Sequence, residues 1–268
     1  MTTVLIEHDS ERKIDYLTLN RPKQLNAINS QMVDELLKYF SDLETRDLLL
    51  NGPVLETRLV VIRGNGRAFC AGLDLQEGGF LESTGVEFFN FQRRLSHIML
   101  LMRRVKQPIV CLTQGAVCGG GLAIALASDI RISTNDAKFN VAMAKIGLTG
   151  GDLGISYFLP RVVGPSMAAE MMMTGKFLHA KRAYELGMIS SLCENVEELN
   201  RRGDEMAHLI VDTTPPLPLV MTKEVLKCSL NAPNLESMVA MEDRQQIISL
   251  KEPTFKEYVS KGFKKSNL

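Results

Sequence analysis

The chain of 268 residues contains no tryptophan and no long apolar run. A transmembrane helix needs about 20 consecutive, mostly apolar residues, so we expect no membrane span. The first residues carry acidic side chains, including Glu7 and Asp9, and no extended apolar core. This is not the pattern of a secretory signal peptide. The absences argue against a membrane protein and against a secreted one.

The chain also lacks net charge, because 31 basic residues balance 31 acidic residues. A neutral protein has no overall electrostatic attraction to nucleic acids or to anionic membranes, and we expect neither as a partner. Any anionic ligand must therefore be bound by groups that lie close together in the fold.

Cysteine is present but is not arranged for disulfides or for zinc. The five cysteines, an odd number without Cys-x-x-Cys spacing, are Cys70, Cys111, Cys118, Cys193 and Cys228. We therefore expect no metal site and a reducing compartment, which favours the cytoplasm. Two lysines precede the last three residues, Ser266-Asn267-Leu268. This ending resembles a degenerate peroxisomal signal, although Asn267 stands where a basic residue is usual, and a peroxisomal location is the alternative.

Short apolar runs alternate with helical patterns in the first part of the chain. The predicted strands are Val4–Glu7, Ile14–Leu19, Leu59–Arg63, Pro108–Leu112 and Ile130–Ser133. One predicted helix is capped by Asn29 or Ser30, and two others cover Glu87–Arg104 and Gly119–Ala127. Such alternation predicts an α/β fold with a mostly parallel sheet. After Pro160 only helices are predicted: Ser166–Thr174, Ala180–Leu186, Val196–Val211, Pro218–Leu230 and Glu236–Leu250. We expect an α/β core over residues 1–195 and a helical region over 196–268 that packs against other subunits.

Two glycine-containing turns are the most informative segments, Phe69–Leu75 and Gly115–Gly121. Each follows a short apolar run and then turns through glycine into a helical pattern, and such a loop-to-helix junction leaves backbone N–H groups without partners. Such groups bind anions. Two that converge could hold the oxygen of a thioester carbonyl as it becomes an enolate. The second turn opens a helix, whose dipole also favours negative charge there.

The order and spacing of several motifs resemble the crotonase superfamily, the enoyl-CoA hydratase/isomerase group. The motifs are Leu19-Asn-Arg-Pro22, Asn26-Ala-Ile-Asn29, Ala68-Phe-Cys-Ala-Gly-Leu-Asp74, Lys106-Gln-Pro108, Gly115–Gly121, Ser128-Asp-Ile-Arg131, Ala137-Lys-Phe139 and Leu159-Pro-Arg161. The resemblance covers nearly the whole chain. It implies a ββα-spiral core with a C-terminal helical trimerisation region, a homotrimer or dimer of trimers, and acyl-CoA thioester substrates. It implies no separate cofactor, since coenzyme A is part of the substrate.

The resemblance also assigns roles to individual residues. It places the oxyanion-hole N–H groups at Leu73 and Gly120. The candidate contacts to the CoA portion are Lys23, Leu25, the backbone of Ala71 facing adenine, Arg67 toward a phosphate, and Asp74. The alternative for Arg67 is an ordinary solvated side chain, and the alternative for Asp74 is stabilisation of its own turn.

The chain departs from the hydratase pattern at both acid/base positions. Hydratases carry one glutamate two residues after the glycine turn and a second about twenty residues later, where this chain has Ala123 and Met143. Neither side chain can transfer a proton, so the sequence does not support the usual two-glutamate mechanism, and a hydratase would need a second acid from the loop over 76–87.

One carboxylate remains nearby, at Asp152 in Gly150-Gly-Asp-Leu-Gly154. The segment resembles the aspartate loop of dienoyl-CoA isomerases and the nucleophile loop of chlorobenzoyl-CoA dehalogenases. Its glycines would allow close approach to a ligand, and partial burial would make Asp152 a better base. The alternative is that Asp152 caps the helical turn that follows.

Other candidates for the pocket are not separated by the sequence. They are Glu77, Glu82 and Glu87 in a loop expected to be mobile over 76–87, His97 on the next helix, and the acyl-pocket candidates Phe80, Phe88, Phe89 and Phe91, for most of which core packing is the alternative.

Three hypotheses follow for function. The first is a hydratase or isomerase in which Asp152 moves the proton. The second is a dehalogenase or thioesterase in which Asp152 is a nucleophile, although a chain without tryptophan cannot build the tryptophan-rich aryl pocket of the chlorobenzoyl enzymes. The third is an acyl-CoA-binding protein that is not an enzyme.

Overall fold

The computed structural model describes residues 2–49, 56–76, 84–252 and 255–265. Its main sheet has six strands in the order β1 (Val4–Asp9), β2 (Ile14–Leu19), β3 (Leu59–Gly64), β4 (Ile109–Thr113), β6 (Ile130–Thr134) and β9 (Ser191–Cys193). β1 and β2 form an antiparallel hairpin, and every later pair in this sheet is parallel. A second sheet orders β5 (Ala116–Cys118), β7 (Lys138–Asn140) and β8 (Leu178–His179).

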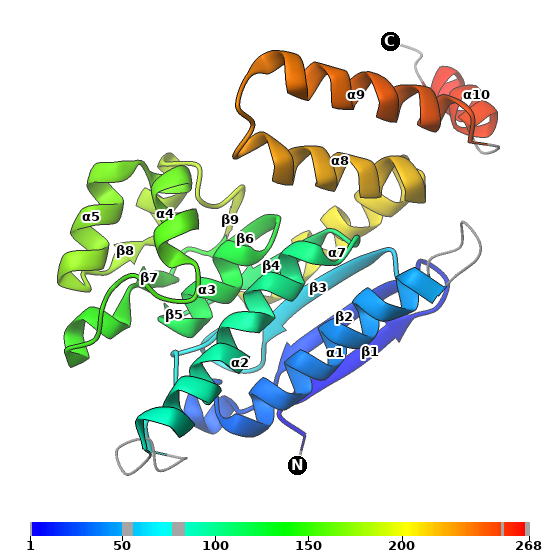
Figure 1. Ribbon diagram of the computed structural model, residues 1–268. Coiled ribbons are helices and arrows are strands. Elements are labelled where there is room, and N and C mark those ends of the chain that lie inside the picture. Colours follow the sequence, from blue (N-terminus) through cyan, green and yellow to red (C-terminus); the bar gives the residue numbers. More distant parts are fainter. Residues whose placement is uncertain (1, 50–55, 77–83, 253–254, 266–268) are drawn as a thin grey trace.

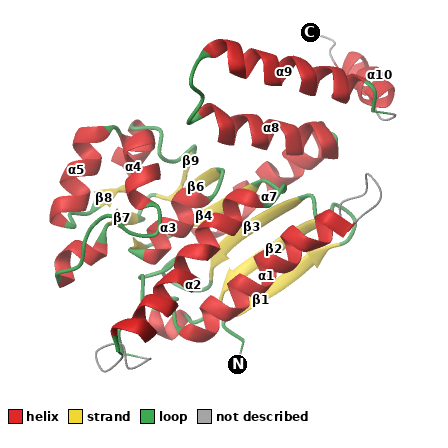
Figure 2. Cartoon of the chain, in the orientation of Figure 1, coloured by secondary structure: helices red, strands yellow, loops and turns green. Residues whose placement is uncertain are grey.

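The helices cover the strands and continue beyond them (Figures 1 and 2). They are α1 (Ser30–Leu49), α2 (Gly85–Arg104), α3 (Gly120–Ala127), α4 (Ile155–Val163), α5 (Pro165–Thr174), α6 (Ala180–Glu185), α7 (Val196–Thr213), α8 (Pro216–Ser229), α9 (Leu235–Leu250) and α10 (Phe255–Lys265), with short 3-10 turns η1 (Pro22–Gln24) and η2 (Ala142–Ile146).

The central strands β3 and β4 are buried on both faces, which explains their continuous apolar runs. In β3, Val60 and Ile62 point to a core shared with α1, α2 and α3, whereas Leu59 and Val61 point to a second core shared with α7. Successive side chains of a strand alternate between faces, so a strand covered on both sides must be apolar at every position. The α/β fold class predicted from the sequence is confirmed.

The prediction of helices alone after Pro160 is wrong. β8 and β9 both follow that residue, and β9 joins the end of the main sheet beside β6. Strands of two and three residues are too short to show a period-2 pattern, because long-range pairing rather than local sequence stabilises them. The sequence pattern also missed β5, β7, α4 and α10.

The last three helices form an arm that stands off the α/β core (Figure 1). α7 packs on the sheet through Leu199 and Ala207, but α9 buries none of its residues within the chain. Its exposed apolar residues include Leu235, at 74% exposure, and Ile247, at 60%. The division at residues 195 and 196 stays a prediction. Among the described helices, none has the length and apolar character needed to cross a bilayer.

Candidate active site

The two glycine turns predicted to act together lie side by side. Cys70 bridges to Val117: the Cys70 N–H donates to the Ala116 carbonyl at 3.0 Å, and the Cys118 N–H donates to the Cys70 carbonyl at 2.9 Å. At the turn itself Gly72 has φ +99°, and a Cβ there would lie 3.1 Å from the Cys118 carbonyl oxygen. Glycine is required because a side chain would be strained and would separate the turns.

The prediction that the first turn leads into a helix is wrong, because Leu73 lies in a parallel bridge to Ile28 and the next described helix, α2, begins at Gly85. The hydrogen bonds of its neighbours direct the Leu73 N–H away from this bridge. The Ile28 N–H donates to the Gly72 carbonyl at 2.7 Å, and the Asp74 N–H donates to the Ile28 carbonyl at 2.9 Å. In this bridge Leu73 faces Ile28, so its own N–H points to the opposite side. Within the described residues this N–H donates to no protein acceptor.

Gly120 supplies the second N–H, because it is the first residue of α3. The first N–H groups of a helix have no intrahelical acceptor, and in the described part of the chain that of Gly120 has no other protein acceptor. A Cβ at Gly120 would lie 2.7 Å from Ile28 Cδ1. The side chain of Ile28 therefore packs against the turn of Gly120, and its backbone forms hydrogen bonds with the turn of Leu73.

Leu73 and Gly120 line the same cavity, of about 140 Å³. Its lining is otherwise Ala71, Gly72, Leu75, Phe88, Gln92, Leu95, Gly119, Ala142, Met143, Ile146, Leu148, Asp152 and Leu153. Asp152 is the single ionisable side chain among these residues, and Gln92 is the other polar one. The cavity is thus an apolar space with two backbone donors and one carboxylate.

Asp152 enters the cavity from the loop before α4. Burial raises the pKa of its carboxyl above the ordinary value, while hydrogen bonds from the Leu153 N–H and from Gln92 act in the opposite direction. The Leu153 N–H donates to Asp152 Oδ1 at 2.8 Å, and the Gln92 amide donates to the same oxygen.

Asp152 does not cap α4, so that alternative is wrong. The N-cap is Gly154, which has no side chain to accept a bond, and Asp152 bonds instead to the residue that follows it. Gly150, two residues before Asp152, is required for packing rather than for the approach of a ligand. A Cβ there would lie 2.3 Å from the Met172 carbonyl oxygen of α5.

The two positions that carry glutamate in hydratases differ in their surroundings. Met143 lines the cavity. Ala123 lies on α3, fully buried in the core, and does not line it. The thioether of Met143 fills space without offering a proton.

Most of the other candidates lie outside the cavity. Glu87 forms a capping box with Thr84 at the start of α2, and the hydrogen bonds of that box lower the pKa of its carboxyl. His97 does not line the cavity. Among the candidate phenylalanines that the structure describes, Phe88 lines it, whereas Phe89 is exposed and Phe91 is in the core. Glu77, Glu82 and Phe80 lie outside the described residues.

The candidate CoA contacts lie on two adjoining loops. The Ala71 N–H donates to the Leu25 carbonyl at 3.0 Å. A Cβ at Gly66 would lie 2.9 Å from Pro22 Cβ, so the two loops are in close contact at these residues. Lys23 and Arg67 are the next residues on the two loops, and both side chains are exposed. Of the four residues Lys23, Leu25, Arg67 and Ala71, only Ala71 is among those that line the cavity.

Asp74 is held by the protein itself. Its carboxylate pairs with Arg21 at 2.8 Å and accepts a hydrogen bond from the Gln76 N–H at 3.1 Å. The carboxylate does not line the cavity. Its role in stabilising the turn is confirmed.

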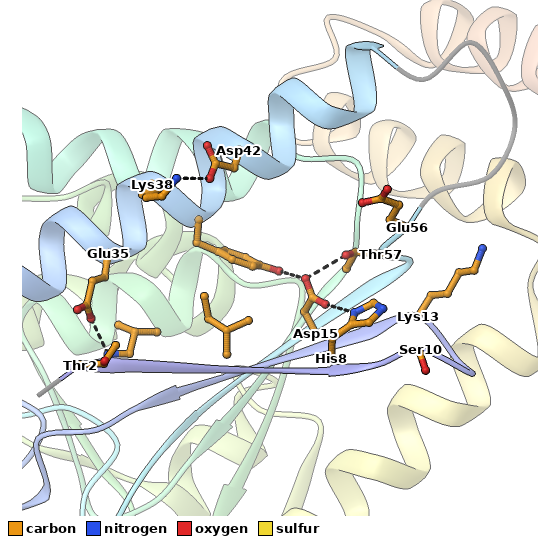
Figure 3. Close-up of a pocket in the computed structure, with 13 residues that line it drawn as sticks. Thr2, His8, Ser10, Lys13, Asp15, Glu35, Lys38, Asp42, Glu56 and Thr57 are labelled. Carbon is orange, nitrogen blue, oxygen red and sulfur yellow. Dashed lines mark hydrogen bonds and ion pairs between the residues drawn. The ribbon is translucent and has the colours of Figure 1, made fainter.

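A larger cavity, of about 600 Å³, lies between β1 and α1 (Figure 3). At its base the buried Asp15 accepts hydrogen bonds from Tyr39 at 2.7 Å and Thr57 at 3.0 Å, and pairs with His8 at 2.6 Å. Tyr39, Thr57 and His8 therefore all bond to this one carboxylate. The described residues contain no group of three or more potential ligands that could hold a metal ion.

The family model described as enoyl-CoA hydratase/isomerase matches residues 9–264 of this chain. The chain belongs to that family. It is 30% identical over 266 residues to a probable enoyl-CoA hydratase of Mycobacterium tuberculosis. The alignment covers 97% of this chain and 90% of the relative. The fold is that of the crotonase superfamily: the crystal structure of an enoyl-CoA hydratase of Mycobacterium smegmatis superimposes with a TM-score of 0.87 at 28% identity, over 99% of this chain and 97% of that one.

Relatives of similar identity carry out different reactions. The 1,2-epoxyphenylacetyl-CoA isomerase of Escherichia coli is 29% identical over 93% of this chain and 92% of its own length. A 4-chlorobenzoyl coenzyme A dehalogenase of Arthrobacter is 28% identical over 90% of this chain and 84% of its own. Its relatives show that this chain is an enzyme of the hydratase/isomerase class, and identity at this level does not distinguish among their reactions.

Proposed function

We propose that this enzyme moves a double bond in an acyl-CoA thioester, with Asp152 carrying the proton. The observation that supports this is the lining of the cavity, where Asp152 is the one ionisable side chain among the described residues. A double-bond shift removes a proton from one carbon and returns it to another, so a single carboxylate suffices. Adding water requires a second group to activate the water.

The backbone donors of Leu73 and Gly120 stabilise the intermediate. Removing the proton next to the thioester carbonyl pushes charge onto the carbonyl oxygen, which becomes an enolate. Two fixed N–H groups in an apolar cavity stabilise that oxygen without reorganising, and one such donor contributes about 10²- to 10³-fold in rate. Asp152 then returns the proton to the far carbon of the allylic system.

The CoA portion binds outside the cavity in this proposal. Ala71 and Leu25 border the exit, and the exposed cations Lys23 and Arg67 meet the phosphates. The substrate supplies coenzyme A, and no separate cofactor is needed. We further propose that the C-terminal arm joins subunits into a homotrimer or a dimer of trimers, because its apolar side chains remain exposed in one chain. The compartment stays as predicted from the sequence, cytoplasmic with peroxisomal as the alternative.

The test compares a 3-enoyl-CoA with crotonyl-CoA, using wild type and Asp152→Asn. An isomerase converts the 3-enoyl substrate to the conjugated thioester, and the ultraviolet absorbance rises. In deuterium oxide a single carboxylate that carries the same proton leaves less than one deuterium per product. Hydration of crotonyl-CoA instead, with loss of absorbance, would replace the isomerase by a hydratase. Full turnover by Asp152→Asn would contradict the role of Asp152.

A nucleophilic aspartate is the second candidate, favoured by the dehalogenase among the relatives. One oxygen of Asp152 would attack the substrate and displace halide from an aryl carbon or the CoA thiolate from the thioester carbonyl. The product on Asp152 would be an aryl ester or an acyl anhydride, respectively, which water then cleaves. Mass spectrometry of the enzyme during slow turnover should then detect an aryl ester or an acyl anhydride on the peptide containing Asp152. Thioester binding with no turnover of any of these substrates would instead favour a binding protein.

A further inference from the structure

Gln92 contacts the proposed proton carrier across the cavity. It lies on α2, one turn after Phe88, and its side-chain amide donates to Asp152 Oδ1, 60 residues away in the chain. Both side chains line the cavity of Leu73 and Gly120. Gln92 is partly buried, so water competes less for this bond than it would at the surface.

The two oxygens of Asp152 are not equivalent. Oδ1 accepts from both the Gln92 amide and the Leu153 N–H. A carboxylate oxygen has two lone pairs in its plane, and two donors occupy both of them. Within the described residues Oδ2 accepts no hydrogen bond from the protein.

We infer that Gln92 is a positioning residue that makes Oδ2 the oxygen of Asp152 that takes and returns the substrate proton. The inference rests on the proposed function, since it concerns the same carboxylate. Gln92 and Leu153 together hold the carboxylate in one orientation, because one donor comes from α2 and the other from the loop itself. With Leu153 alone, the carboxylate could rotate and the proton could reside on either oxygen.

An amide suits this position better than a charged donor would. A lysine or arginine at residue 92 would form an ion pair with Asp152 and strongly favour the ionised carboxylate, which is then a weak base. A glutamate would repel it. Glutamine donates a hydrogen bond without adding a charge, so it orients Asp152 while burial continues to dominate the pKa shift.

The test replaces Gln92 by methionine, which has a similar length and no donor. We expect kcat to fall about 10- to 100-fold with KM nearly unchanged, since misplacing a catalytic group by about 1 Å costs on this scale. The acidic limb of the kcat profile should move to higher pH, because a donor that stabilised the ionised form is gone. A variant that merely loosened packing would not move this limb. Asn90→Met, at an exposed site on the same helix, is the matched control and should behave as wild type.

A double-mutant cycle separates the two proposals. On an Asp152→Asn background, Gln92→Met should cause no further loss. Full activity in Asp152→Asn contradicts the proposed function itself. Inactive Asp152→Asn together with Gln92→Met of wild-type rate and pH profile contradicts only the role of Gln92. If Gln92→Met does not fold, Gln92→Asn retains an amide too short to reach Asp152. Carbon-13 NMR titration of the Asp152 carboxyl in the free enzyme then tests the same shift without turnover, and an unchanged midpoint would overturn the inference.

Discussion

Lys223 of α8 is buried against Asp129 at the start of β6, with Nζ 3.0 Å from Oδ2. The ammonium group also donates to the carbonyl of Gln107 at 2.6 Å, and Arg103 pairs with the other oxygen of Asp129 at 2.6 Å. Lys223 is the only residue of α8 buried within the chain. The pair of Lys223 and Asp129 anchors the C-terminal arm to the core.

Lys223→Met should destabilise the protein by about 3 kcal/mol, because removing one partner leaves a buried charge with less compensation. Equilibrium unfolding in urea measures the loss. Lys38→Met removes an exposed partner of Asp42 and should change stability by less than about 0.5 kcal/mol. Equal effects of the two variants would contradict the anchoring role.

Asp152→Asn should lower kcat by about 10²- to 10⁴-fold, the usual contribution of a general acid–base group. In wild type, activity should fall as the pH decreases through the pKa of Asp152, since the base must be ionised. Burial raises that pKa, so the limb should lie above the value of about 3.9 of an exposed aspartate. A pH profile of kcat checks this, and a limb at or below that value would contradict it.

The same substitution should stabilise the fold near neutral pH. A carboxyl whose pKa is raised by folding favours the folded state below its unfolded pKa, and this contribution is lost as the pH rises through the folded pKa. Asparagine does not titrate and can still accept the hydrogen bonds from Gln92 and Leu153. The midpoint of thermal unfolding of Asp152→Asn should therefore exceed that of wild type at pH 7 and approach it below about pH 4. A lower midpoint at pH 7 would be the contrary result.

Gly120→Ala should lower kcat by about 10²- to 10³-fold, because the new Cβ displaces the N–H from the enolate oxygen. The Cβ would meet Ile28 Cδ1, so adding Ile28→Val, which removes that atom, should restore part of the rate. Gly85→Ala, where a Cβ meets nothing within 4 Å, is the control and should leave kcat unchanged. No rescue by Ile28→Val would argue against this contact as the cause.

Ile247→Asp should weaken the assembly of subunits if the arm joins them. The side chain is 60% exposed within one chain, and a charge buried in an apolar interface is costly. Analytical ultracentrifugation should detect smaller species for this variant than for wild type. Val86→Asp, at an exposed site near the start of α2, is the control. An unchanged assembly of Ile247→Asp would place the interface elsewhere.

The sequence by itself determined the parts of this protein that depend on local pattern. Apolar runs predicted the five longer strands of the main sheet. The turns at Gly72 and Gly119 were marked by glycine, because their backbone conformations favour that residue. The absence of glutamate at Ala123 and Met143 was also readable directly. Each of these signals lies within a few residues, so no knowledge of distant contacts was needed.

Only the tertiary structure decided which side chains meet. The bond from Gln92 to Asp152 joins a helix and a loop that no local pattern connects, and the buried partner of Lys223 lies in a different part of the chain. β9 likewise forms because β6 offers an unpaired edge. Such contacts depend on how the layers pack, and packing brings together residues whose sequence separation carries no signal.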